Sequence, residues 1–533
     1  MSVTLAPIFA SGMVLQRELP VRVWGTASPG TLVEVEVQGQ TSSCTAGNDG
    51  AWCCTLPALH ASDDETLTVV AGEERLVLSD VAVGEVFIAA GQSNMEFWMR
   101  YDQQVEEFRP TCANPHIRFF DQPKCSYPGQ TEDFDYSKVG IWRKATPEDL
   151  DYFSAVGYYF ARGLEMILDV PVGIVGCNYG GTKSSAWMAP EHARVVEPEQ
   201  MAAFDASLKG LPYEELLANG SLNVSKNDKG YATWPAWNEL FLPRTPTEDE
   251  AKAFMMAELG LSDESAEVGG LSLGDAQSAE EAARHVRPGM LTPTKDGPGA
   301  LFTYMVLPLA GFATRGVLWY QGESDDEDEG AQVRYAEALR TIIADWREAW
   351  QREDLPFLVV QLPGFGWWTG MGLEAHDWPT IRACQQQVAD EDERVWLCSI
   401  GDMGNKRDIH PKEKKPIGER LVLLALRHLF GMDIQADAPR CTRAERKGPW
   451  IILHFEHAGS GLMLLGAEVN ALEVLCDGVP VSFHAGTRGD RLVIAPSDPT
   501  PGPIEVRFAQ GNWHHINLYG GTELPVLPFA VSC

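Results

Sequence analysis

The run EVFIAAGQSNM spans residues 85–95 and joins an apolar strand to a glycine, a glutamine and a serine. A strand that is apolar on both faces belongs inside a parallel sheet covered by helices on both sides. Similar compact apolar runs follow at 172–178, 316–321, 357–363 and 395–402, and apolar residues recur at helical spacing over 154–168 and 333–350. The pattern predicts an α/β domain with a doubly wound parallel sheet.

Short β-branched runs flank this domain on both sides. They lie at 21–25, 31–39 and 66–72 before it, and at 450–455, 472–478, 491–496 and 504–509 after a helical segment at 416–430. Turn residues separate the runs at the spacing typical of small β-sandwiches. We therefore expect an N-terminal β module over 1–80, the α/β domain over 81–435 and a C-terminal β module over 436–533. The stretch from about 205 to 300 is rich in Glu, Asp, Ser and Gly and is expected to be an insertion, with a helix at 248–260.

Composition excludes several classes of partner. The 533 residues carry 42 basic and 75 acidic side chains, a net charge of −33, which repels nucleic acid and anionic membranes. The same field disfavours densely sialylated polymers unless the site itself carries local positive charge, and it is nearly indifferent to a small ligand. The apolar stretch at 301–313 is too short to span a bilayer and contains Pro308.

The expected compartment is the cytoplasm. The first residues, MSVTLAPIFASGMVLQ, do not have the basic and apolar regions of a secretory signal. The 11 cysteines are scattered and show no zinc-binding spacing, which predicts reduced thiols. A secreted protein whose signal had been trimmed would look the same.

Polar residues follow every strand of the predicted sheet, where ligands bind in open α/β folds. Ser93 follows the first strand on a turn into a helix, which exposes its hydroxyl and places its N–H where an oxyanion is stabilised. Met95 occupies the last position of the G-x-S-x-G elbow, so that motif is absent. Taken alone, such a serine is more often a helix cap.

His410 is the candidate general base, because it follows the last strand and precedes a loop that leads into a helix. Two carboxylates compete as its partner, Asp408 by proximity in the chain and Glu323 by its position at the end of a central strand. The candidate oxyanion donors are the N–H of Ser93, the backbone of Gly180 or Gly181, and the side-chain amide of Gln321. Four tryptophans either stack on sugar rings or lie buried: Trp187, Trp367, Trp368 and Trp378.

Taken together, GQSNMEF (91–97), NYGGTKSSAW (178–187), GVLWYQGESD (316–325) and DIHP (408–411) resemble the sialate O-acetylesterase family of SGNH-type hydrolases. The stretches at 5–17, 153–164 and 414–426 extend the resemblance over most of the chain. It implies a flavodoxin-like SGNH domain with accessory β modules and removal of O-acetyl groups from sialic acids. It also implies Ser93 as nucleophile, His410 as base, the Gly-Gly-Thr segment as a glycine donor and QGE as the oxyanion and acid region.

The sequence departs from the family pattern in two places. SGNH enzymes commonly place the acid three residues before the histidine, where this chain has Arg407, and Asp408 lies one step closer. Related acetylxylan esterases use the glutamate of QGE, so both carboxylates stay open. The segment before MVLPL reads Leu-Phe-Thr instead of Leu-Tyr-Asn, which affects a substrate contact and not the chemistry.

The sequence thus predicts a serine esterase without metal or cofactor that acts on a small-molecule or glycan-linked O-acetylated sugar through an acyl-enzyme. One alternative keeps this chemistry and changes the substrate to acetylxylan or another plant polysaccharide. A second is a carbohydrate-binding protein built around an inactive hydrolase core. A third is a metallohydrolase that uses Asp402, Asp408, His410 and His376. The sequence does not indicate an oligomeric state.

Overall fold

The computed structural model describes residues 2–127, 138–207, 243–245, 247, 249–250, 295, 297–327, 330–368 and 373–533. Most of the predicted insertion, including nearly all of the helix expected at 248–260, lies outside the described residues. Everything stated below concerns the described part of the chain.

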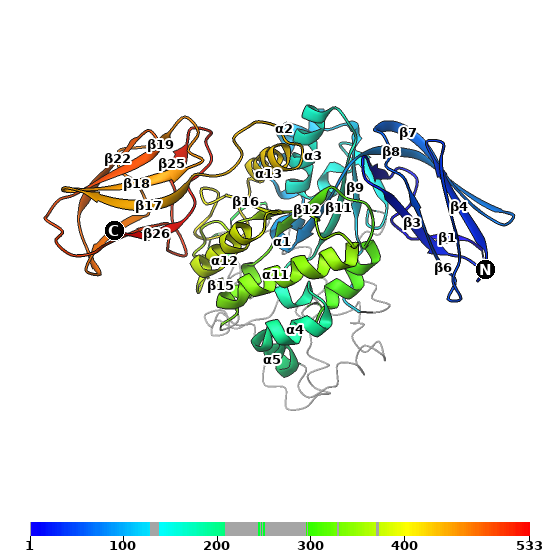
Figure 1. The fold of residues 1–533 in the computed structure, drawn as a ribbon, viewed down its shortest axis with the longest axis horizontal. Helices are drawn as coiled ribbons and strands as arrows, with labels where there is room; N and C mark the ends of the chain where they lie inside the picture. Colours follow the sequence, from blue (N-terminus) through cyan, green and yellow to red (C-terminus); the bar gives the residue numbers. More distant parts are fainter. Residues whose placement is uncertain are drawn as a thin grey trace.

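A parallel sheet forms the centre of the molecule (Figure 1). All of its strands run parallel except the edge strand β10, which pairs antiparallel with β9. The five strands expected from apolar runs are present, and the sequence analysis did not identify β9 and β10. In spatial order the strands are β10 (Trp142–Ala145), β9 (Asn114–Asp121), β11 (Val172–Asn178), β8 (Glu74–Gly91), β12 (Gly316–Tyr320), β13 (Phe357–Val360) and β16 (Val395–Cys398).

Helices cover both faces of this sheet. Phe87 of β8 contacts Phe160 of α3 edge to face, and Trp319 of β12 contacts Trp346 of α11 in the same way. Trp319 is in register with Ala90, three residues beyond Phe87, and side chains alternate along a strand, so these two contacts lie on opposite faces. The helices are α1 (Ser93–Glu96), α2 (Val105–Phe108), α3 (Ala155–Leu168), α4 (Pro190–Val196), α5 (Pro198–Ser207), α11 (Ala331–Trp350), α12 (Trp378–Glu391) and α13 (Lys415–His428).

The N-terminal region is all β, and it is continuous with the central sheet. Strand β8 pairs antiparallel with β7 through its first half and parallel with β11 and β12 through its second half. The boundary expected after residue 80 therefore falls inside one strand. The other strands of this region are β1 (Thr4–Leu5), β2 (Val14–Gln16), β3 (Val21–Thr26), β4 (Leu32–Val37), β5 (Gln40–Thr45), β6 (Ala51–Leu56) and β7 (Ser62–Ala71).

The C-terminal region is also all β and has an apolar core of its own. Two four-stranded antiparallel sheets, β17-β18-β23-β22 and β21-β20-β24-β26, lie at the opposite end of the molecule from the N-terminal strands (Figure 1). Its strands are β17 (Arg440–Lys447), β18 (Trp450–Glu456), β19 (Leu462–Leu464), β20 (Leu472–Cys476), β21 (Val479–Pro480), β22 (Phe483–Arg488), β23 (Arg491–Pro496), β24 (Ile504–Phe508), β25 (Leu518–Gly520) and β26 (Phe529–Ser532).

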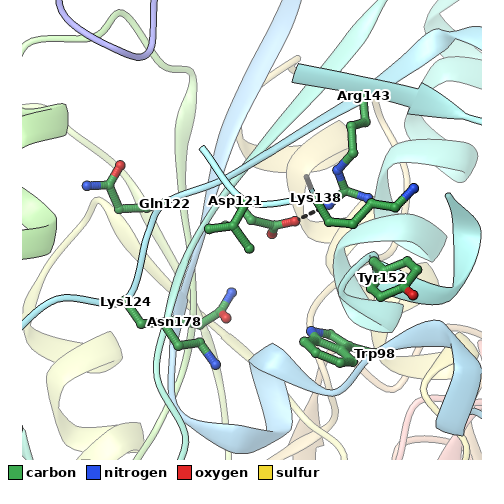
Figure 2. Close-up of a pocket in the computed structure, with 10 residues that line it drawn as sticks. Trp98, Asp121, Gln122, Lys124, Lys138, Arg143, Tyr152 and Asn178 are labelled. Carbon is green, nitrogen blue, oxygen red and sulfur yellow. Dashed lines mark hydrogen bonds and ion pairs between the residues drawn. The ribbon is translucent and has the colours of Figure 1, made fainter. Parts of the chain in front are cut away.

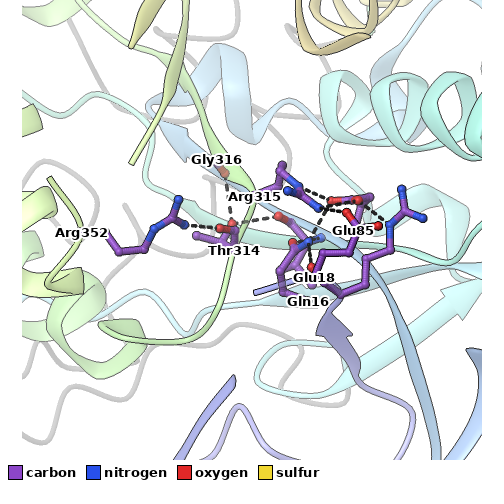
Figure 3. Close-up of polar contacts among 9 residues, drawn as sticks. Gln16, Glu18, Glu85, Thr314, Arg315, Gly316 and Arg352 are labelled. Atoms are coloured by element: carbon purple, nitrogen blue, oxygen red, sulfur yellow. Dashed lines mark hydrogen bonds and ion pairs between the residues drawn. The ribbon is translucent and has the colours of Figure 1, made fainter. Parts of the chain in front are cut away.

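A buried carboxylate joins the N-terminal region to the amino-terminal side of the central sheet (Figure 3). Glu85 of β8 is fully buried and accepts hydrogen bonds from Arg17 Nε at 2.7 Å, Gln16 Nε2 at 2.9 Å and Arg315 Nε at 2.7 Å. These partners come from β2, the residue after it, and the loop before β12. Among the described residues, no helix is long and apolar enough to cross a membrane.

Candidate active site

Ser93 lies where β8 ends and α1 begins. Gly91, the last residue of β8, has φ +132°, and a Cβ there would lie 2.0 Å from the carbonyl oxygen of Tyr320 in β12. Only glycine fits this approach of two strands. In the sheet register Gly91 is level with Asn178 of β11 and Tyr320 of β12, so the loops after these three strands meet at one edge. Ser93 stands at that edge and is half-buried.

The structure brings His410 to the serine. Its Nε2 lies 2.9 Å from Ser93 Oγ, across 317 positions of sequence, because the loop between β16 and α13 reaches the same sheet edge. Burial lowers the pKa of His410 well below its usual value, and the charges of Lys412 and Lys414 lower it further. The imidazole is therefore neutral near pH 7, which is the form that accepts a proton.

Asp408 lies in the same loop and contacts the histidine through the backbone. Its Oδ1 accepts a hydrogen bond from the backbone N–H of His410 at 2.9 Å. Its Oδ2 lies 2.9 Å from Lys412 Nζ and accepts a hydrogen bond from Thr245 Oγ1 at 2.7 Å. The carboxylate is fully buried and fixes the turn that carries His410.

Glu323 approaches the same loop from the other side through Asn94. The Asn94 amide donates to Glu323 Oε1 at 2.7 Å and to the carbonyl of Ile409 at 3.0 Å, while Lys414 Nζ donates to Asn94 Oδ1 at 2.6 Å. Burial raises the pKa of Glu323 to about 7, against the opposing hydrogen bond from Asn94. Burial also lowers the pKa of Lys414 to about 7. Asn94 and Lys414 were not identified by the sequence analysis, although both lie in stretches that carried the family resemblance.

The Gly180–Gly181 turn lies against the serine, but its first N–H is already used. A Cβ on Gly180 would lie 3.2 Å from Ser93 Cβ, and the Gly180 N–H donates to Glu96 Oε2 at 2.8 Å. Gly181 has φ +63° and is exposed. The Gly180 N–H therefore already has an acceptor in Glu96, and Gly181 is the glycine of this turn whose N–H is the better candidate to bind an oxyanion.

Gln321 was predicted as an oxyanion donor, and the structure gives its amide other partners. Its Nε2 donates to the Thr182 carbonyl at 3.0 Å and to the buried carboxylate of Asp325. Asp325 in turn accepts hydrogen bonds from Ser184 and Gln200. Gln321 is fully buried in this network, which links the loops after β11 and β12 and so holds the Gly180–Gly181 turn beside Ser93.

Two of the four candidate sugar-stacking tryptophans belong to the core. Trp187 and Trp378 are buried, and Trp187 packs edge to face on Trp319. Trp367 is partly exposed, and its ring lies 5.2 Å from Lys406 Nζ. The side chain of Trp368 lies outside the described part of the structure.

The metallohydrolase alternative required Asp402, Asp408, His410 and His376 to converge, and the structure gives two of them separate partners. Asp402 forms a two-fold ion pair with Arg420 at 2.7 and 2.8 Å, and His376 contacts Asp326. Over the ranges that the structure describes, no group of three or more His, Cys, Asp or Glu side chains is arranged to hold a metal ion.

The family model described as "Carbohydrate esterase, sialic acid-specific acetylesterase" matches residues 300–421, which contain Glu323, Asp408 and His410. The chain is 24% identical to a sialate O-acetylesterase of Rattus norvegicus over 456 residues, or 79% of this chain and 72% of the relative. It is 29% identical to the human sialate O-acetylesterase over 193 residues, which span 33% of this chain and only 36% of that relative.

A solved structure matches over nearly the full length. A carbohydrate acetylesterase from Xanthomonas citri superposes with a TM-score of 0.72 at 27% identity and covers 99% of both chains. The central sheet with a β region on either side is therefore an arrangement that this chain shares with the carbohydrate acetylesterase.

Proposed function

Because the chain belongs to the sialate O-acetylesterase family, we propose that it is a serine esterase that removes O-acetyl groups from sialic acids. The observation that carries the proposal is the 2.9 Å contact between Ser93 Oγ and His410 Nε2 at the carboxyl edge of the sheet. Nucleophile and base are within hydrogen-bond reach, as acyl transfer requires. The sheet order and the serine directly after a central strand support an SGNH-type domain.

In the proposed first step His410 Nε2 takes the proton of Ser93 Oγ as the oxygen attacks the acetyl carbonyl. The tetrahedral intermediate collapses when the imidazolium gives this proton to the sugar oxygen, which leaves as an alcohol. His410 then takes a proton from water as it attacks the acetyl-Ser93 ester, and the imidazolium returns this proton to Ser93 Oγ as the C–O bond breaks and acetic acid is released. The neutral resting state of His410 suits the first of these proton transfers.

The oxyanion of the intermediate is assigned to backbone donors. The N–H of Ser93 and that of Gly181 are the candidates, because the Gly180 N–H binds Glu96 and the Gln321 amide binds Thr182 and Asp325. Each such donor contributes about 2.7–4 kcal/mol of transition-state stabilisation in enzymes where it has been removed.

We assign the role of the acid to Asp408. Its carboxylate contacts the histidine's own backbone, whereas Glu323 reaches the loop only through Asn94. A pKa of about 7 also leaves Glu323 about half protonated at pH 7 and mostly protonated below it, so it is the weaker stabiliser of an imidazolium.

The test of the proposed function is Ser93→Ala with 4-nitrophenyl acetate and an O-acetylated sialic acid as substrates. We expect turnover of both to fall by at least about 10⁴-fold, because no other hydroxyl replaces the nucleophile. A melting temperature equal to that of the wild type shows that the loss is chemical. Turnover retained by the alanine variant would overturn the assignment.

A further inference from the structure

A hollow lined largely by polar residues lies at the carboxyl ends of β9 and β11 (Figure 2). Its cavity volume is about 50 Å³, which is room for a group of a few atoms such as a carboxylate, and it opens to solvent. The hollow is lined by Trp98, Lys124, Lys138, Arg143, Tyr152 and Asn178, among others. The sequence analysis assigned no function to any of them.

Neighbouring side chains connect this hollow to the nucleophile. Asn178 is in register with Gly91, two residues before Ser93. Lys124 forms an ion pair with Glu96, which sits on the same short helix as Ser93 and also binds the Gly180 N–H. A substrate bound in the hollow therefore lies next to the Gly180–Gly181 turn and the serine.

Arg143 gives the hollow a buried cation with hydrogen-bonding capacity to spare. Its side chain is 4% exposed, and Nη2 donates to Asp121 Oδ2 at 2.5 Å. Within the described structure its Nε and Nη1 are buried and make no hydrogen bond; Nη1 stands 3.8 Å from Asp149 Oδ1. Buried donors are rarely left unsatisfied, because the loss costs about 1–3 kcal/mol, so an acceptor that reached Arg143 in this hollow would be stabilised there.

The other lining residues suit an acidic sugar. Lys138 Nζ donates to Asp149 at 2.6 Å and lies 5.3 Å from the ring of Tyr152, which leaves further ammonium protons on the same side as Arg143. The rings of Trp98 and Tyr152 are 5.8 Å apart and form an apolar wall. Burial raises the pKa of Asp121, the carboxylate that pairs with Arg143, and so favours its neutral form.

We propose that this hollow binds the carboxylate of an acidic sugar while the sugar's acetyl group lies at Ser93, an inference that rests on the proposed esterase function. Arg143 and Lys138 donate hydrogen bonds to the carboxylate, and Trp98 and Tyr152 pack against the apolar parts of the sugar. Arg143 and Lys138 each already pair with a carboxylate, so the hollow offers an anionic group directed hydrogen bonds and not a net positive charge. A neutral acetylated sugar, such as a xylan unit, makes none of these charged contacts.

The test compares two substrates on the intact wild-type protein: an O-acetylated sialic acid and its 1-carboxamide, in which an uncharged NH2 donor replaces one carboxylate oxygen. We expect kcat/KM to be higher for the acid by about ten-fold or more, as charge-assisted hydrogen bonds predict. Equal values for the two substrates would overturn the proposal. Wild-type protein that hydrolyses neither of them nor 4-nitrophenyl acetate would instead contradict the esterase function.

Variants then locate the effect. Arg143→Lys and Lys138→Gln should each reduce the ratio of acid to carboxamide toward one. The matched control is Lys144→Gln, which removes one positive charge at the next position, where Lys144 pairs with Asp80 away from the hollow; it should keep the wild-type ratio. If Arg143→Lys does not fold, the proposal is still tested by the ratio of acid to carboxamide in the wild type and in Lys138→Gln. A ratio that stays at the wild-type value in Lys138→Gln and a folded Arg143→Lys would overturn the assignment.

Discussion

At the scale of single residues, the candidate active site combines a buried base, His410, with two lysines that disfavour its charged form. Lys412 and Lys414 lie near His410, and both lower its pKa in addition to burial. The proposed reaction nevertheless needs His410 to become an imidazolium for the lifetime of each intermediate. A carboxylate close to the same loop is the group that makes this charged state accessible, and the identity of that carboxylate can be tested directly.

Asp408→Asn and Glu323→Gln separate the two carboxylates. We expect Asp408→Asn to lower kcat by about 10²–10⁴-fold, the range seen when the acid of a serine hydrolase triad is neutralised. Glu323→Gln should cost much less, because the Gln side chain keeps an oxygen that accepts from Asn94. Steady-state rates on 4-nitrophenyl acetate measure both effects, and the reverse order would transfer the role to Glu323.

The acid limb of the pH profile reports the state of His410. A general base is active when it is neutral, so activity falls as the pH drops through the pKa of His410. Because this pKa lies well below 6.5, kcat/KM should stay constant from pH 7 to below 6.5. Lys412→Met removes a nearby positive charge and frees Asp408, and both changes raise the pKa of His410. We therefore expect the acid limb to move to higher pH in this variant. An unshifted or downward-shifted limb would show that Lys412 does not act on the base.

At the scale of elements, apolar runs were sufficient to locate strands β8, β11, β12, β13 and β16. They could not locate β9, whose first residues Asn-Pro-His carry little of the apolar signal, or β10, whose sequence Trp-Arg-Lys-Ala has two basic residues at its centre. The sequence motifs also did not predict which loops would contact each other. The sequence placed Gln321 and Gly180 at the correct edge, but the hydrogen bonds from Gln321 to Thr182 and from Gly180 to Glu96 join residues that are 139 and 84 positions apart.

The Glu85 cluster joins such distant elements, and it can be tested by stability. Glu85→Gln leaves the guanidinium groups of Arg17 and Arg315 without their buried counter-charge, which typically costs about 3–5 kcal/mol. The control is Glu18→Gln: Glu18 also pairs with Arg315, at 3.2 Å, but is 59% exposed, so the loss should stay below about 1 kcal/mol. Urea unfolding followed by tryptophan fluorescence measures both. Similar midpoints for the two variants would show that the buried cluster adds no stability.

At the scale of the whole molecule, the described residues form two main apolar cores and not three. The N-terminal strands and the α/β region share one core, because β8 runs through both, while the C-terminal strands have a separate core. The sequence could indicate three regions by their composition. It could not show that the first two fold around a common strand, since pairing along both halves of β8 depends on partners distant in the chain.

Two cores predict two unfolding transitions. We expect calorimetry to resolve one transition for residues up to about 435 and another for the C-terminal strands, since cooperativity follows shared packing. Leu453→Ala removes a fully buried side chain of the C-terminal core, and Leu358→Ala removes one of the central core. Each should destabilise its own transition by about 2–5 kcal/mol and leave the other nearly unchanged. The Asn512 side chain bonds the backbone of Ala375 and Trp378 across the two regions, so some coupling is expected. A single transition shifted equally by both variants would show that this contact makes the cores one cooperative unit.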